Sequence, residues 1–195
     1  LDAVFVQVGG GALASAVVQG FSEAHRAGET ARLPRFYAVQ TAGAAPLARA
    51  HARIVDRLRA SLPVGLALER NPSALARSIA SRPALVEDAM KFARTHRSLF
   101  MWPWEQEPRS IAHGILDDET YDWAAVVEGM LRTGGRPIVV SEDRLQAANE
   151  AARERTGIDV DHTGSAGLAG LMQALEEEPD LRREHVAVLF TGVRR

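Results

Sequence analysis

The chain contains no cysteine. Disulfide bonds, thiolate metal ligands and cysteine nucleophiles are therefore excluded, and the absence agrees with a reducing cytoplasmic compartment. No apolar run approaches the ~20 residues needed to cross a bilayer, and no basic segment leads into an apolar stretch as in a signal peptide. We therefore expect a cytoplasmic protein that neither enters nor binds a membrane.

Lysine is almost absent too, because Lys91 stands alone beside 22 arginines. With 25 acidic residues the formal net charge is −2, and no block of like charge occurs. A nucleic-acid surface is not indicated, so a small ligand is expected. Lys91 lies within a predicted helix, where we expect an ordinary surface lysine. His51 has no second ligand at helical spacing, so we expect no metal site and a surface or hydrogen-bonded histidine.

The sequence does contain a junction of strand, glycines and helix near its first residue. Val4–Val8 suits a buried strand, Gly9–Gly11 follow, and an apolar helical stripe begins at Leu13. The first turn of a helix has free backbone N–H groups and a partial positive charge, and glycines let an anion approach them. The junction therefore predicts a phosphate or carboxylate site. A tight turn without a ligand is the alternative.

Strands and helices alternate along the rest of the chain. The predicted strands cover 35–41, 137–140 and 185–192, and the predicted helices cover 45–62, 72–81, 83–96, 121–132, 141–157 and a segment rich in small residues from 166. This order predicts a single α/β domain with an open, mostly parallel sheet and helices on both faces. Ligands bind at the carboxyl ends of such strands. The glycine junction and Thr191, at the end of the last strand, should therefore face one crevice.

Two segments invite other functions. Trp102-Pro103-Trp104 could form a binding site, but tryptophans beside a proline more often pack a loop onto the core or a partner subunit. Asp117-Asp118-Glu119 could hold a divalent metal. Acidic residues are also favoured in the first turn of a helix, so we expect them to stabilise the start of the helix at 121–132.

The glycine junction resembles the phosphate loop of fold-type II pyridoxal-phosphate enzymes, with Ala12 where the family usually has a fourth glycine. Within that group the sequence resembles threonine synthase. The other motifs that carry the resemblance follow in the family's order: 39–47, 110–115, Gly134-Gly135 before a strand, 163–170 and 189–192. Asp161-His162 departs from the family, since many relatives have Glu-Pro there.

The resemblance implies that pyridoxal 5'-phosphate is the cofactor and that its phosphate is held by the backbone amides of Gly9, Gly10, Gly11, Ala12 and Leu13. Thr191 would then hydrogen-bond the pyridine nitrogen. The implied activity is that of a lyase or synthase acting on an amino acid, with conversion of O-phosphohomoserine to threonine favoured. The family also implies a homo-oligomer.

The resemblance places the lysine that forms the Schiff base before the glycine loop. Residues 1–195 are therefore expected to be a single α/β unit, the carboxyl-terminal part of a longer enzyme. Such a unit would lack its catalytic lysine and be inactive alone.

Three other functions stay open. A serine or threonine dehydratase shares the loop and the terminal hydroxyl. A nicotinamide-dependent oxidoreductase fits the spacing Gly9-x-Gly11-x-x-Ala14, but it needs an acid at the end of the second strand, which ends Val39-Gln40-Thr41. A catalytically silent homologue would keep the fold and lose the cofactor.

Overall fold

The computed structural model describes residues 1–193 and places four parallel strands in one sheet, in the order β3-β2-β1-β4. The strands are β1 (Ala3–Gln7), β2 (Arg35–Thr41), β3 (Pro137–Val140) and β4 (Val186–Val188). In register, Ala3 of β1 lies beside Arg35 of β2 and Val186 of β4. The predicted open parallel sheet is confirmed.

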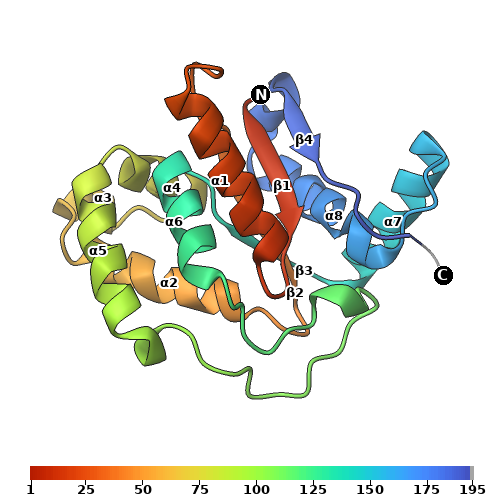
Figure 1. The fold of residues 1–195 in the computed structure, drawn as a ribbon, viewed down its shortest axis with the longest axis horizontal. Coiled ribbons are helices and arrows are strands. Elements are labelled where there is room, and N and C mark those ends of the chain that lie inside the picture. Colours follow the sequence, from red (N-terminus) through yellow and green to blue (C-terminus); the bar gives the residue numbers. More distant parts are fainter. Residues whose placement is uncertain (194–195) are drawn as a thin grey trace.

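Helices cover both faces of this sheet, as Figure 1 shows. One face carries α1 (Ala12–Arg26), α2 (Pro46–Arg59), α4 (Pro72–Ala80), α5 (Pro83–Thr95) and α6 (Trp123–Thr133). The other face carries α7 (Glu142–Thr156) and α8 (His162–Glu177). The short helix α3 (Val64–Ala67) and three 3-10 turns, η1 (Arg97–Leu99), η2 (His113–Ile115) and η3 (Pro179–Arg183), complete the described chain.

The central strand β1 explains why its sequence is apolar throughout. Side chains of a strand alternate between the two faces. Val4 and Val6 therefore join the hydrophobic core under α1, α2 and α6, whereas Ala3 and Phe5 join the core under α8. A parallel strand covered on both faces needs no polar alternation.

A capping side chain and two glycines mark the ends of α6 and α7. The Ser141 hydroxyl accepts a hydrogen bond from the Arg144 N–H and caps α7. Gly134 and Gly157 end α6 and α7 with φ of 75° and 70°, values that glycine adopts without steric cost.

Two predictions are wrong: that the acidic run begins a helix, and that the last strand covers 185–192. The acidic run does not begin a helix, because α6 starts at Trp123, and Glu119 instead forms an ion pair with Arg97. The last strand is shorter and less buried than predicted. Within the described residues β4 pairs only with β1, so it lies at an edge and its three residues are half-buried.

The tryptophan loop packs on an arginine of α2, and neither Trp102 nor Trp104 belongs to the hydrophobic cores of the described residues. The Arg49 guanidinium, in the first turn of α2, lies 3.8 Å from the ring centroid of Trp102 and 5.1 Å from that of Trp104. None of the helices within residues 1–193 is both long enough and apolar enough to span a bilayer.

Candidate anion site at the carboxyl edge of the sheet

The glycine loop connects the end of β1 to the start of α1. Gly11 has φ of 97° and forms the N-cap of α1 without any side-chain capping bond. The loop carbonyls are occupied, because Gly9 O accepts from the Thr120 hydroxyl (2.9 Å) and Gly10 O accepts from the Asp122 N–H (3.0 Å). The segment before α6 therefore holds the loop in place.

The N–H groups of the same loop are free. No backbone or side-chain acceptor within residues 1–193 takes a hydrogen bond from any N–H between Gly9 and Ala14. Ala12 and Leu13 are exposed at the start of α1. A row of unpaired N–H groups at a helix N-terminus is a suitable site for a phosphate or carboxylate.

The loop leaves almost no room for side chains. A Cβ on Gly11 would lie 2.9 Å from Thr120 Cγ2, and one on Gly10 would lie 3.1 Å from the ring of Tyr121. Packing therefore accounts for the glycines, and the free N–H groups are the separate observation that favours a ligand.

Carboxylates beside the loop oppose an anion: Asp122 accepts from the Ser15 hydroxyl at 2.9 Å in the first turn of α1, and Asp117 lies against Gly9. The carboxylate of Asp117 packs against the Cα of Gly9 and has no hydrogen-bond partner within the described residues. Its negative charge lowers the attraction of the loop for a phosphate, whereas the N-terminal dipole of α1 raises it. The donor set fits a phosphate group, with Asp117 as a weakening neighbour.

Thr191 lies beside the end of β1. Its hydroxyl oxygen accepts a hydrogen bond from Nε2 of Gln7, the last residue of β1. Gln7 is only two residues before Gly9, so this contact places the loop and Thr191 at the same carboxyl edge of the sheet.

A close approach of two backbones fixes the segment that carries Thr191. The segment at Gly192 packs tightly on the start of α8. A Cβ on Gly164 would collide with the backbone N of Gly192, and a Cβ on Gly192 would collide with the Asp161 carboxylate. Asp161 also caps α8 by accepting a hydrogen bond from the Gly164 N–H at 2.6 Å.

Two buried glutamines were not among the predicted site residues. Gln7 is 5% exposed, and Gln40 is 1% exposed. Gln40 accepts from the Ala48 N–H at 3.0 Å and donates to the Val8 carbonyl at 3.4 Å, which links α2 to the start of the loop. A polar residue inside an apolar strand was the available signal. β2 contains no Asp or Glu and ends at Thr41, so it offers no acid for a nicotinamide ribose.

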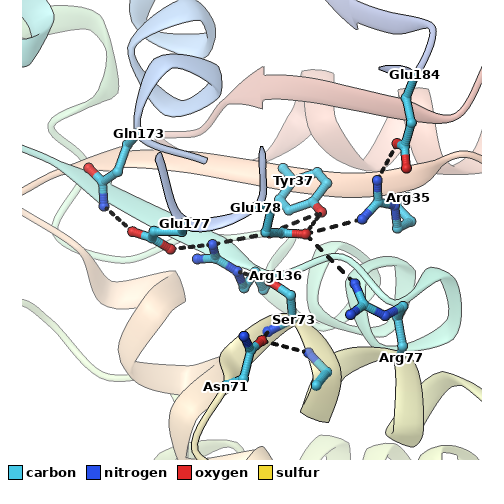
Figure 2. Close-up of polar contacts among 11 residues, drawn as sticks. Arg35, Tyr37, Asn71, Ser73, Arg77, Arg136, Gln173, Glu177, Glu178 and Glu184 are labelled. Atoms are coloured by element: carbon cyan, nitrogen blue, oxygen red, sulfur yellow. Dashed lines mark hydrogen bonds and ion pairs between the residues drawn. The ribbon is translucent and has the colours of Figure 1, made fainter. Parts of the chain in front are cut away.

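The opposite edge of the sheet holds a network of ion pairs (Figure 2). Glu178 accepts from Arg35 (3.2 Å), Arg136 (3.3 Å) and the Tyr37 hydroxyl (3.2 Å). Burial and the Glu178 carboxylate raise the pKa of Tyr37 well above its ordinary value, so the phenol remains a neutral donor. These charges are paired with one another, which makes them structural.

His51 is buried, and its Nε2 has no hydrogen-bond partner within the described residues. The prediction of a surface or hydrogen-bonded histidine is therefore wrong. Burial and the nearby Arg136 lower the pKa of His51 to about 4. No group of three or more His, Asp or Glu side chains in residues 1–193 is arranged to hold a metal ion.

Two grooves of the described chain are not lined by the glycine loop itself, although Ser15 and Asp122, beside the loop, line the first of them. One of about 400 Å³ lies between α1 and α6, and one of about 330 Å³ lies beside α2 and α4. Neither is lined by Gly9–Gly11 or by Thr191. Ala12 and Leu13 are exposed, so the candidate site lies on the surface of the described chain.

No family model matches the sequence, and no curated protein matches it. Solved structures share its fold. A serine racemase from Dictyostelium discoideum is 16% identical, with a TM-score of 0.60 over 100% of this chain. The processed form of threonine deaminase isoform 2 from Solanum lycopersicum is 15% identical, with a TM-score of 0.61 over 100% of this chain. The threonine deaminase of T.th. is 18% identical, with a TM-score of 0.57 over 99% of this chain.

This chain spans 44%, 41% and 50% of those three structures, in the same order. The likeness shows the fold, an α/β arrangement with a four-stranded parallel sheet between helices. It agrees with the fold class that the motif order predicts.

Proposed function

We propose that this chain is part of a pyridoxal-phosphate enzyme that acts on an amino acid, and that it supplies the phosphate loop and the group facing the pyridine nitrogen. The observation that carries the proposal is the row of unpaired N–H groups from Gly9 to Ala14. The fold shared with a serine racemase and threonine deaminases supports it. The resemblance of the glycine loop to the fold-type II phosphate loop supports it independently.

Each residue of the site has a defined task in this proposal. The N–H groups of Gly9, Gly10, Gly11, Ala12 and Leu13 bind the phosphate, and the dipole of α1 adds to the attraction. The Thr191 hydroxyl orients the ring by a hydrogen bond to its nitrogen. When bound, pyridoxal phosphate withdraws electrons from the substrate α-carbon. A neutral hydroxyl at the ring nitrogen moderates this withdrawal, which suits elimination or replacement at the amino-acid side chain.

Two candidate reactions can be distinguished by their products. Deamination of serine or threonine is favoured by the shared fold, since two of the three structures named above are threonine deaminases. Threonine synthesis from O-phosphohomoserine is favoured by the segment 39–47. The natural full-length protein should release ammonia and a keto acid from serine or threonine in the first case, and inorganic phosphate from O-phosphohomoserine in the second.

The cofactor is tested by borohydride reduction of the natural full-length protein, followed by digestion and mass spectrometry. We expect a pyridoxyl group on a lysine outside residues 1–195. A folded protein that gives no adduct would overturn the proposal. Binding of a nicotinamide would then favour an oxidoreductase, and binding of neither cofactor would favour a silent homologue.

A further inference from the structure

Gln7, the last residue of β1, has a buried side-chain amide whose Nε2 and Oε1 atoms lie in different surroundings. Its Nε2 donates to the Thr191 hydroxyl oxygen, and its Oε1 is buried without a partner within the described residues. Gly167 of α8 lies against this side chain, since a Cβ there would be 3.5 Å from Oε1. The amide is therefore confined between α8 and Thr191.

The orientation of the amide has a physical reason. Nε2 donates to the Thr191 hydroxyl, and the end of the amide that lacks a partner is the carbonyl oxygen Oε1, which faces α8. Buried N–H groups without an acceptor are rarer than carbonyl oxygens without a donor. The unpaired end of Gln7 is thus of the kind that folded proteins tolerate more often.

A donor that points at Thr191 controls what its hydroxyl can do. A hydroxyl oxygen that accepts a hydrogen bond becomes a weaker acceptor and a better donor, because bonds in a chain polarise one another. Its own hydrogen is then available for an acceptor on the open side.

We propose that Gln7 is a positioning residue that makes Thr191 a hydrogen-bond donor to the pyridine nitrogen and thereby favours the unprotonated ring. This inference rests on the proposed function. The close contact of Gly164 with Gly192 and the bond from Gln7 hold Thr191 from two sides, so the hydroxyl is fixed before a ligand arrives.

The test uses the natural full-length protein loaded with pyridoxal phosphate and compares Gln7→Met, Thr191→Val and the double variant. The ratio of the long-wavelength to the short-wavelength absorbance band of the bound cofactor changes with the charge on the pyridine nitrogen, because protonation of the ring and of the imine are coupled. We expect Gln7→Met and Thr191→Val to change this ratio in the same direction, by about twofold or more. The double variant should change it no further than Thr191→Val does.

Two controls are needed. One tests whether the change at Gln7 affects the cofactor ring without affecting its phosphate, and the other tests whether removal of any glutamine amide has the same effect. The phosphorus NMR signal of the cofactor should stay unchanged in Gln7→Met, because the loop N–H groups are intact. Gln173→Met removes an exposed amide of α8 that donates to Glu177, and it should leave the ratio unchanged. If Gln7→Met does not fold, Gln7→Glu keeps the shape. Its ionised carboxylate accepts from Thr191 and should change the ratio in the same direction.

The outcomes are distinct. A changed ratio in Thr191→Val with an unchanged ratio in Gln7→Met would overturn the role of Gln7 and leave the proposed function intact. Additive changes in the double variant would also overturn it, because Gln7 would then act independently of Thr191. A wild-type protein without a cofactor band would overturn the proposed function, and this inference with it.

Discussion

Gly11 combines two constraints of the loop in one residue. Its φ of 97° is in the left-handed region, and an added Cβ would meet Thr120 Cγ2 at 2.9 Å. Gly11→Ala should lower the free energy of unfolding by about 1–2 kcal/mol for the backbone strain alone and weaken cofactor binding. Gly20→Ala on the same helix meets no atom within 4 Å and should stabilise the protein by about 0.5–1 kcal/mol. Denaturant titration and cofactor titration test both. Equal cofactor affinity in the two variants would contradict the loop assignment.

Replacement of Asp117 should strengthen cofactor binding rather than weaken it. Because its carboxylate lies against Gly9, Asp117→Asn should tighten cofactor binding by about threefold to tenfold at low ionic strength. The gain should shrink as salt is added, since charges near the surface are screened. Titrations at two salt concentrations measure this. Weaker binding by the variant would show that Asp117 assists the ligand.

His51 predicts a pH dependence of stability. Its pKa of about 4 in the folded protein is below the unfolded value of about 6.5, so the unfolded chain binds more protons between these values. Stability from the neutral imidazole is fully present above about pH 6.5 and is lost as the pH falls toward 4, up to roughly 3 kcal/mol. The free energy of unfolding of His51→Gln should depend less on pH in this window. An identical pH profile would contradict the depressed pKa.

At the scale of elements, α8 packs on the sheet and runs from the carboxyl ends of the strands to their amino ends. Its glycines face the strands, because a Cβ on Gly167 would lie 3.1 Å from the Phe5 carbonyl and one on Gly170 would collide with Val39. The small residues predicted for this helix are therefore explained by close packing on β1 and β2. The carboxyl end of α8 leads to Glu178 at the opposite edge.

Glu178 links α8 to β2, and Arg136 directly precedes β3 (Figure 2). The Glu178 side chain is only 8% exposed, so Glu178→Gln removes the buried carboxylate and leaves Arg35 and Arg136 with only the more exposed Glu184 and Glu177 as partners. The free energy of unfolding should fall by about 3 kcal/mol, the usual result of removing one partner of a buried pair. Glu107→Gln removes an ion pair with Arg109 whose side chains are 75% and 81% exposed, and it should change stability by less than about 1 kcal/mol. Similar effects in both variants would contradict a structural network at Glu178.

At the scale of the whole molecule, Lys91 is exposed on α5, which covers the face of the sheet that also carries α2 and α6. Within residues 1–193, no hydrogen bond or ion pair joins its side chain to Thr120 or Asp122, which hold the glycine loop. Lys91→Arg in the natural full-length protein should therefore leave the cofactor spectrum and the activity unchanged. Loss of the cofactor band in this variant would overturn the proposal that the covalent lysine lies outside residues 1–195.

The sequence by itself determined the order of strands and helices, the parallel sheet and most helix ends. These follow from local features, because apolar periodicity, glycine and capping residues act within a few positions. It also marked Gly9–Gly11 and Thr191, since the glycines come just after the first strand and Thr191 lies near the end of the last predicted one. The short β4 and the position of the acidic run were not determined locally, because edge pairing and helix starts depend on contacts with distant segments.

Only the tertiary structure decided which polar groups are occupied and which are free. Gln7 meets Thr191 across 184 positions of sequence, and Asp117 reaches Gly9 only because the segment before α6 packs on the loop. His51 is likewise buried because α2 packs into the hydrophobic core. Hydrogen bonding and burial are properties of the assembled neighbours. The site therefore depends on contacts that no local pattern contains.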